Sequence, residues 1–570
     1  ILNTELAGYS GIICSIIPEM RDWFEKVGEI DVVEKEKESD RIIHVLSVLF
    51  TTLCNARKLV VFIDDFQWVD RITFDVIKRF LEQKSPCLLI CNYRTGENED
   101  LLYSFGFDLN TLGFDKLIHI KPFTKTETEE LVLMRFAIIN KSDDLIHALY
   151  TKTDGVPFVL TEAIRYLVNN GMLVIDSKGW SFKEQSIFSL PEKFDSVSLI
   201  LSKLKVLAPE EKKFLQLASL IEGKFDCDII EKLGGFPCVA ARSIAARLEN
   251  IGFIAMQLKG GFAFIHDRVQ ESIVSGIPSD DRFAYYETLG KIYLHKAETD
   301  KESIFNAAEC YLKSKNMAKA MEICYQAAVY ASDKIAFDVA IRYFKSAALM
   351  VDNAEKSMVK PSIDLIKFNM AFGDILVMTG ANEQGLKVFG KLDEDLKLDT
   401  YQRLEVKYKI GSIFHNLGEF EKASPCFIEA LSEAGIRIPE KRFKIFFTSF
   451  IGAIYQIMMS FGLKHILIKK NDSMSLLKVR ILNKLCYSLY FYDMIKGYCV
   501  HFKAMNLADT LIDSYEKSEA YTTHQIPIYQ TFFKNRAFKY FNKATKLSQF
   551  IHRLDSLAFA QSFGGAIHYF

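Results

Sequence analysis

The sequence has no excess of charge of either sign and very little proline. Lys and Arg number 71 against 72 Asp and Glu, which gives a formal net charge of −1, and only 12 of the 570 residues are proline. A nucleic-acid-binding protein usually carries a basic excess, and a disordered chain carries few apolar residues. Here 49% of the residues are hydrophobic. The composition excludes a disordered scaffold and argues against nucleic-acid binding, and the length predicts about three to five domains.

Paired cysteines and a secretory signal are also missing. The eleven cysteines are scattered, no Cys-x-x-Cys occurs, and Cys87 and Cys91 stand on one predicted strand. This pattern favours buried, reduced thiols in a cytoplasmic protein over disulfides or a zinc site. The first residue is Ile, and no charged start followed by an apolar stretch and a cleavage site is present. We therefore expect a piece of a longer protein.

Long apolar runs are rare, and residues 445–463 are the one run that needs a membrane test. The run has no charged residue, and lysines flank it on both sides. Its length permits a short spanning helix, but Thr448, Ser449, Gln456 and Ser460 dilute it. We predict a helix packed within or against the repeat array and not a membrane span. A membrane is therefore not an expected partner, although the lysine-rich flanks leave shallow interfacial binding open.

Helices and strands alternate over residues 1–122. Three short apolar runs rich in β-branched residues predict strands that are buried on both faces of a parallel sheet. These runs are 59–63, 87–91 and 117–120. Helices are predicted at 6–25, 41–56 and 71–83. This alternation predicts an α/β layered domain.

The rest of the chain is predicted to be mostly helical. Residues 123–190 predict a helical lid. Over 191–278, helices are followed by a hairpin-like pair of runs at 252–258 and 262–267, which predicts a winged-helix domain. Helices then continue over 279–570.

A helical repeat recurs within residues 279–570. Its fullest copy has the small and large residues of a tetratricopeptide repeat at Gly411, Phe414, Gly418, Ala423, Phe427 and Ala430. Partial copies lie at Gly373, Gly380 and Phe389, at Ala320, Cys324 and Ala327, at Ala340, Phe344 and Ala347, and at Ala537, Phe541 and Ala544. Small residues let paired helices approach closely, and the large residue fills the gap between them. The spacing predicts an array of tetratricopeptide-like repeats, which suits protein partners.

Two adjacent carboxylates end the first predicted strand. Asp64 and Asp65 directly follow the run 59–63. In P-loop nucleotide triphosphatases such a strand places one carboxylate beside Mg²⁺, usually through water, and a second carboxylate can orient the attacking water. The alternative is that the pair merely ends the strand, while Asp70 caps the following helix. The segment alone leaves both interpretations open.

The segment IDDFQWVD (63–70) and its surroundings resemble the AAA-like ATPase module of the signal-transduction ATPases with numerous domains. The branch that it resembles is fused to serine/threonine kinases, hybrid sensor histidine kinases and class III adenylyl cyclases. The segments that continue the resemblance, in order, are IIPEM (16–20), CNYRTGE (91–97), TDGVPFVLTEAIRYL (153–167), LPEKFDSVSLILSKL (190–204) and FAFIHDRV (262–269).

The resemblance implies a switch that uses ATP and Mg²⁺, and it assigns roles to single residues. It implies that Asp64 holds Mg²⁺ through water, that Asp65 orients the attacking water and that Arg94 senses the γ-phosphate. The residues that it places near the adenine and the phosphates are Gly155, Pro157 and His266. Each assignment has a structural alternative: a surface ion pair for the arginine, a turn between helices for the Gly-x-Pro, and a half-buried strand position for the histidine.

One part of the family pattern is missing, because no GxxxxGK[ST] loop occurs in the 570 residues. The nearest match, 385–392, has Leu392 in place of the hydroxyl residue and lies in a predicted helix. Such a loop supplies the N–H groups and the lysine that grip the phosphates. The family places the loop upstream of this strand, so we expect it to precede Ile1 and expect this chain to bind ATP poorly. Asp65 also stands where many AAA ATPases have Glu, and the shorter side chain predicts slow hydrolysis.

The predicted fold is a partial α/β P-loop ATPase core followed by a helical lid, a winged helix and an all-α tetratricopeptide-like repeat array. The predicted function is an ATP-dependent regulatory switch and scaffold with a kinase or cyclase output domain in the same polypeptide. One alternative is a nucleotide-free scaffold with a degenerate ATPase fold. A winged-helix transcription regulator is the other, and the near-zero net charge disfavours it.

Overall fold

The computed structural model divides into two compact units. Unit 1 comprises Ile1–Phe114 and Tyr325–Phe570, and unit 2 comprises Asp115–Cys324. The residues that the structure describes are 6–28, 35–83, 86–94, 115–135, 143–176, 179–182, 204, 207–234, 236–257, 260–265, 267–356, 361–394, 397–460, 472–530 and 534–569.

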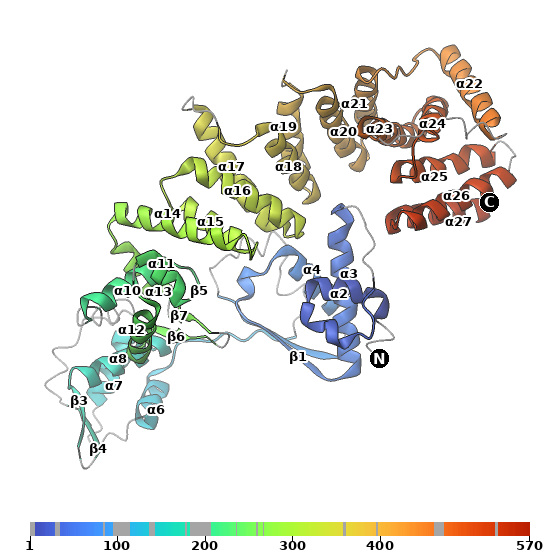
Figure 1. The fold of residues 1–570 in the computed structure, drawn as a ribbon. Helices are drawn as coiled ribbons and strands as arrows, with labels where there is room; N and C mark the ends of the chain where they lie inside the picture. The colour runs from blue at the N-terminus through green and yellow to red at the C-terminus, as the bar shows by residue number, and fades with distance from the viewer. Residues whose placement is uncertain are drawn as a thin grey trace. The chain divides into compact units, whose positions relative to one another are not determined.

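The N-terminal part of unit 1 has two parallel strands with helices beside them (Figure 1). Its elements are η1 (Ala7–Tyr9), α2 (Ser10–Ile16), η2 (Pro18–Trp23), α3 (Lys35–Ala56), β1 (Leu59–Ile63), η3 (Phe66–Trp68), α4 (Arg71–Glu82) and β2 (Cys87–Cys91). The strands pair in register from Leu59 with Cys87 to Ile63 with Cys91. Phe66, Phe74 and Ile77 pack against the side chains of Ile63 and Leu89, so a helical layer covers one face of the strands.

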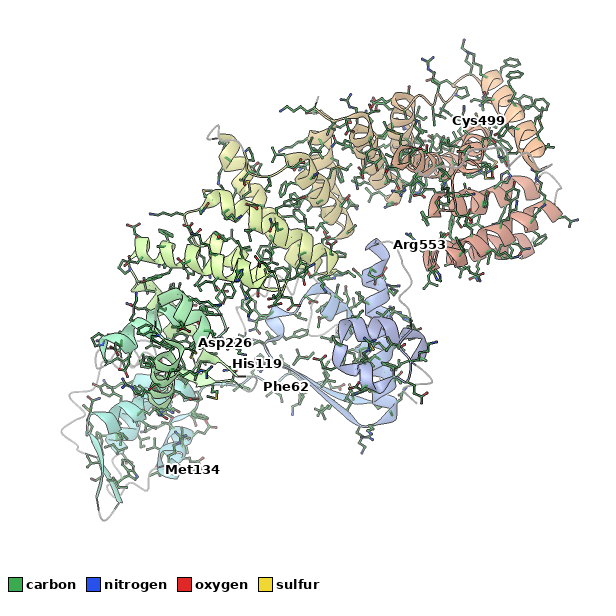
Figure 2. The ribbon with its side chains drawn as sticks, viewed as in Figure 1. Phe62, His119, Met134, Asp226, Cys499 and Arg553 are labelled. Carbon is green, nitrogen blue, oxygen red and sulfur yellow. The ribbon has the colours of Figure 1, made fainter. Side chains whose placement is uncertain are left out.

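The other face of β1 and β2 is exposed, and the prediction that these strands are buried on both faces is therefore wrong for the described structure. Val60 and Phe62 of β1 are 63% and 59% exposed, and Leu88 and Ile90 of β2 are exposed with them. Phe62 is labelled in Figure 2. The apolar run correctly predicted the strands, because alternate side chains need only one covered face to form a core.

Unit 2 is mostly helical with two small antiparallel sheets. Its helices are α6 (Lys125–Arg135), α7 (Asp143–Thr153), α8 (Pro157–Asn169), α10 (Pro209–Ser219), α11 (Cys227–Gly234), α12 (Cys238–Ile251), α13 (Asp267–Ser275), α14 (Ser279–Lys296) and α15 (Ser303–Leu312). Its strands are β3 (Leu173–Asp176), β4 (Gly179–Phe182), β5 (Lys224–Phe225), β6 (Ile254–Met256) and β7 (Phe262–Phe264). β3 pairs with β4, and the second sheet has the order β5-β7-β6.

Two predictions for unit 2 have different outcomes. The hairpin-like pair forms as β6 and β7, shorter than predicted, with β6 against α12 and β7 against α13. The prediction of a third strand of the α/β core at 117–120 is wrong, because the structure shows no strand there. Its side chains are exposed, Ile120 at 94%. A strand needs a neighbour that completes its hydrogen bonds, and no strand of the described residues pairs with this run.

The regular secondary structure of the described residues in the C-terminal part is helical. Its helices are α16 (Met317–Asp333), α17 (Phe337–Lys356), α18 (Leu365–Met378), α19 (Asn382–Asp393), α20 (Thr400–Asn416), α21 (Phe420–Glu433), α22 (Arg442–Ser460), α23 (Ser473–Tyr490), α24 (Met494–Ala508), α25 (Tyr515–Gln530), α26 (Lys534–Phe550) and α27 (Leu554–Tyr569). Successive helices pack in pairs, such as α18 with α19 and α20 with α21 (Figure 1). The boundary between the two units falls inside α16.

Close helix pairing in this region depends on a glycine that faces an aromatic ring. A Cβ atom on Gly373 of α18 would lie 2.5 Å from Phe389 of α19, and one on Gly411 of α20 would lie 2.5 Å from Phe427 of α21. Both rings are fully buried. The same small-and-large pairing was predicted from the repeat spacing, and the helices it predicted are present.

The apolar run 445–463 contributes to α22, which packs against α24 as predicted. Residues 461–463 lie outside the described residues. None of the helices that the structure describes combines the length and the apolar character needed to cross a bilayer.

A buried histidine pair joins α24 to α25 and predicts acid sensitivity. Nε2 of His501 lies 2.6 Å from Nδ1 of His524, and both rings are 1% exposed. Burial lowers the pKa of His501 to about 3, from an ordinary value of 6.5. The unfolded chain therefore binds a proton at a higher pH than the folded chain does. Stability from the neutral ring is present above pH 6.5 and is lost as the pH falls toward 3.

We expect the free energy of unfolding to fall with decreasing pH in this window, by up to about 1.4 kcal/mol per pH unit for this one ring. Urea unfolding of the parent and of His501→Leu at a series of pH values measures the effect. Carboxylates contribute equally to both proteins, so the difference between the two pH profiles reports on the buried His501–His524 pair. His295→Gln, at a largely exposed position, is the control that should follow the parent. Parallel pH profiles for parent and His501→Leu would contradict the assignment.

Candidate functional site

The candidate site lies at the carboxyl edge of β1 and β2. Asp64 and Asp65 follow Ile63, the last residue of β1, and Asn92 follows Cys91, the last residue of β2. Because the two strands are parallel and in register, these residues leave the sheet at the same edge. This is the edge at which open α/β sheets bind their ligands.

The backbone after β1 is held in an uncommon conformation. Asp65 has φ 51° and ψ 48°, in the left-handed region that Asp tolerates better than most residues. Its N–H donates to Oδ1 of Asn92 at 2.6 Å and to Oδ1 of Asp64 at 3.1 Å. The next N–H, that of Phe66, donates to the carbonyl oxygen of Asn92 at 2.8 Å. Asn92 therefore fixes the turn that presents both carboxylates.

A buried glutamine connects the second carboxylate to the arginine after β2. Gln67 is fully buried, its Nε2 donates to Oδ1 of Asp65 at 3.0 Å, and its Oε1 accepts the N–H of Arg94 at 3.2 Å. Nε of Arg94 lies 3.6 Å from the same Oδ1 of Asp65. Both charged side chains are about half exposed or more, so the ion pair itself adds little stability. The structure thus brings the predicted Asp65 and Arg94 together.

The other two carboxylates of the segment 63–70, Asp64 and Asp70, differ in their hydrogen-bond partners. Asp64 is exposed at the edge of the sheet. Oδ1 of Asp70 accepts the N–H of Thr73 at 2.6 Å and caps α4, as the structural alternative predicted for this residue. The same alternative describes Asp64 and Asp65 as the end of the strand, and both directly follow Ile63, the last residue of β1.

The side chains at this edge offer oxygen donors of the kind that Mg²⁺ prefers. Mg²⁺ is commonly held in proteins by one or two carboxylates together with water and substrate phosphates. An exposed Asp64 beside Asp65 and the amide oxygen of Asn92 supplies hard oxygen donors of that kind. No group of three or more metal-binding side chains occurs among the described residues. The site fits a Mg²⁺ that arrives with phosphates better than a cation held by protein ligands alone.

The predicted adenine segment begins with a tight backbone contact inside unit 2. Gly155 has φ +68°, and its carbonyl oxygen accepts the N–H of Phe123 at 2.8 Å. A Cβ atom at this position would lie 2.1 Å from the carbonyl oxygen of Phe123. Pro157 is the first residue of α8, where its fixed φ suits a helix start. Local structure alone therefore requires this glycine and favours this proline. His266 lies outside the described residues.

Sequence reasoning missed Gln67 and Asn92. The signal for Gln67 was a polar residue between two aromatic ones directly after the carboxylate pair, and the signal for Asn92 was an amide at the end of the second apolar run. Both are positioning residues, since they hold Asp65 and the turn around it.

Comparisons with known proteins identify the repeats. The tetratricopeptide repeat family model matches residues 404–435, which include most of α20 and all of α21. This match confirms the repeat prediction for its fullest copy. No curated protein matches the chain.

Among solved structures, the chain is similar to a signal-transduction ATPase with numerous domains that has a tetratricopeptide repeat sensor, from Pyrococcus horikoshii. The sequences are 15% identical, the alignment covers 93% of this chain and 74% of that one, and the TM-score is 0.41. Similarity at this level assigns neither a family nor an activity to the chain.

Proposed function

We propose that the chain is an ATP-dependent regulatory switch and scaffold module of a larger signalling protein. The observation that carries the proposal is the Gln67 bridge between Asp65 and Arg94 at the carboxyl edge of two parallel strands. Gln67 ties the carboxylate of Asp65 to the backbone N–H of Arg94, and the guanidinium of Arg94 lies beside the same carboxylate at the edge of the sheet. The same arrangement is useful where both groups must face one ligand.

In this proposal each residue of the edge has one role. Asp64 holds Mg²⁺ through water, and bound Mg²⁺ neutralises charge on the phosphates. Asp65, held by Gln67 and Asn92, orients a water molecule, and Arg94 faces the terminal phosphate. Gly155, Pro157 and His266 stay predicted parts of the nucleotide pocket. The chain's own sequence has no phosphate-binding loop, so the proposal assigns that loop to sequence outside these 570 residues.

The repeats and the winged helix connect the nucleotide site to protein partners and to an output domain. The repeats that contain residues 404–435 bind protein partners. The helices and small sheet of 191–278 form a winged helix, and the module works in the cytoplasm on a kinase or cyclase output domain in the same polypeptide. The alternative is a nucleotide-free scaffold, which the absence of a GxxxxGK[ST] loop from these 570 residues favours.

Nucleotide binding separates the two proposals. We expect the 570-residue chain to bind MgATP more weakly than about 1 mM in calorimetric titrations. In a longer protein that contains a GxxxxGK[ST] loop, Asp64→Asn should lose Mg²⁺-dependent hydrolysis, and Asp65→Asn should bind ATP but lose turnover. Asp70→Asn, which alters only the cap of α4, is the matched control and should retain both.

Three results would count against the switch. One is micromolar binding by the 570-residue chain, which would refute the assignment of the loop to other sequence. Another is unchanged hydrolysis in Asp65→Asn, which would refute the roles at the edge. A coding sequence that contains no such loop would leave the nucleotide-free scaffold as the function.

A further inference from the structure

Helix α22 has one face that is fixed to the rest of the repeat region. Ile445 is buried, and a Cβ atom on Gly452 would lie 2.8 Å from Cβ of Phe502 in α24. Nε2 of Gln456 donates to Oδ1 of Asn506 at 2.8 Å and to Oδ2 of Asp509 at 3.0 Å. These contacts lie seven and four residues apart, which places them on one side of the helix, so the opposite side faces outward.

From Phe443 to Met458 the outward face of α22 is apolar, apart from the exposed Lys444 in the first turn. Its exposed side chains recur with helical spacing and are Phe443, Phe446, Phe447, Phe450, Ile451, Ile454, Ile457 and Met458. Phe443 is 79% exposed and Phe446 is 67% exposed. A continuous stripe of large apolar side chains in water is unusual for a surface helix, and such a patch marks an interaction site.

Charge of one sign accompanies this stripe. Residues 441–471 contain no Asp or Glu, although the whole chain has a formal net charge of only −1. Lys441, Arg442 and Lys444 are exposed at the first turn of α22. The apolar stripe therefore begins at a cationic end, and basic residues beside exposed apolar side chains are attracted to the surface of an anionic bilayer.

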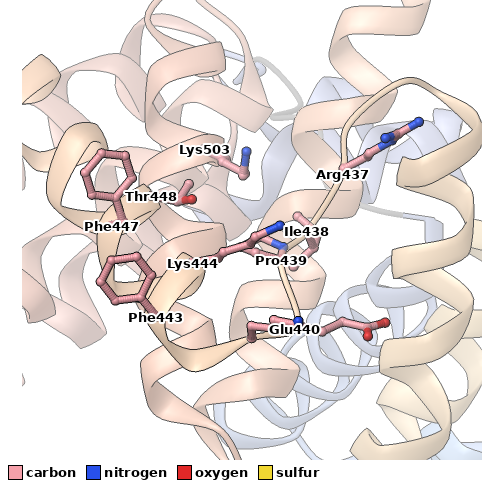
Figure 3. A pocket seen from close by; sticks show the side chains of 10 residues that line it. Arg437, Ile438, Pro439, Glu440, Phe443, Lys444, Phe447, Thr448 and Lys503 are labelled. Atoms are coloured by element: carbon pink, nitrogen blue, oxygen red, sulfur yellow. The ribbon is translucent and has the colours of Figure 1, made fainter.

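A cavity lies beside this cationic end (Figure 3). Its volume is about 620 Å³, and Arg437, Lys441, Lys444 and Lys503 line it together with Glu440. The rings of Phe443 and Phe447 also line it and stack with their centroids 6.4 Å apart. Cationic side chains and exposed aromatic rings at one opening match the two ends of an anionic phospholipid, its headgroup and its acyl chains.

We propose that α22 docks on the surface of membranes that contain anionic phospholipids. The phenylalanine stripe enters the boundary between headgroups and acyl chains, and a lipid phosphate occupies the cavity at the cationic end. This is peripheral binding, because the opposite face of α22 stays packed on α24. A second copy of the chain is a poorer occupant, since it would bring another cationic patch of the same sign against this one. The proposal does not depend on nucleotide binding.

Vesicle flotation with the full chain tests the proposal. We expect binding to vesicles of phosphatidylcholine with phosphatidylserine, much weaker binding to phosphatidylcholine alone, and loss of binding at high salt. Lys441→Gln with Lys444→Gln should weaken binding about fivefold for each charge removed. Phe446→Gln with Phe450→Gln should weaken it by on the order of tenfold or more, since these rings do not line the cavity but would enter the lipid.

Matched controls lie elsewhere in the repeat region. Phe550→Gln changes an equally exposed ring of α26, and Lys387→Gln with Lys391→Gln changes two exposed lysines of α19. Both controls should bind vesicles like the parent. All variants should keep the parent's circular dichroism spectrum and melting temperature, because every altered side chain is exposed.

Four results would overturn the proposal. One is the absence of vesicle binding, and another is equal binding with and without phosphatidylserine. A third is the combination of unchanged vesicle binding in the Phe446→Gln, Phe450→Gln variant with loss of vesicle binding when inorganic phosphate is added. This combination would show that the cavity is a site for free phosphate. The fourth is a dimer of the parent in sedimentation velocity runs that this variant abolishes, which would show that a second copy covers the stripe.

Discussion

Replacing Gly155 with alanine should destabilise unit 2 by about 2–5 kcal/mol. The left-handed conformation at φ +68° costs an L-residue with a Cβ about 1–2 kcal/mol. The new Cβ would also lie 2.1 Å from the carbonyl oxygen of Phe123. That atom is backbone, so it cannot rotate away as a side chain can. The chain must instead open the contact in which the N–H of Phe123 donates to the carbonyl oxygen of Gly155.

Gly171→Ala is the matched control for this prediction. Gly171 has φ +63°, close to that of Gly155, but a Cβ atom there would meet nothing within 4 Å. It should lose only the conformational part, about 1–2 kcal/mol. Urea unfolding and hydrogen exchange over 143–176 measure both variants. Equal losses would show that the approach to Phe123 carries no energy. If Gly155→Ala loses more stability than Gly171→Ala, a loss of nucleotide binding in Gly155→Ala is explained by destabilised folding and is not evidence that Gly155 contacts adenine.

The strands show what a short apolar run can and cannot predict. Runs 59–63 and 87–91 form strands with the predicted bounds, because β-branched and apolar residues between turn signals leave few other structures. Burial on both faces was wrong, because it depends on which elements cover the sheet, and that is not encoded within the run. The run at 117–120 has the same local character without a pairing strand.

The site shows a similar division between local and distant information. Asp64, Asp65 and Arg94 were predicted from motif order, and parallel strands of equal length bring the ends together. Gln67 and Asn92 were missed, because their importance comes from hydrogen bonds to residues about 27 positions away, as between Asp65 and Asn92. The roles of Asp64, Asp65 and Arg94 toward a nucleotide stay predictions. The repeat was predicted well, because neighbouring helices pair within one short stretch of sequence.

Replacing Phe427 with alanine should cost about 3–5 kcal/mol and should be the most damaging single change in the matched repeat. The ring is fully buried and belongs to a cluster with Leu404, Ala423 and Leu485. It also covers Gly411, whose missing side chain makes room for it. Removal of the ring leaves a cavity between α20 and α21 that the packed helices cannot close. Phe550→Ala, at a ring 72% exposed on α26, should change stability by less than about 0.5 kcal/mol.

A double-mutant cycle with Gly411 tests whether the glycine and the ring act together. A Cβ on Gly411 would lie 2.5 Å from Cε1 of Phe427, so Gly411→Ala alone should displace the ring and destabilise the pair by about 1–3 kcal/mol. In the background of Phe427→Leu the smaller side chain leaves room for the new methyl group. The same Gly411→Ala change should then cost much less, with a coupling free energy of about 1 kcal/mol or more in urea unfolding. If the losses in free energy of unfolding are additive, the ring of Phe427 does not require a small residue at position 411. The residue spacing that predicted these helices would then have another physical cause.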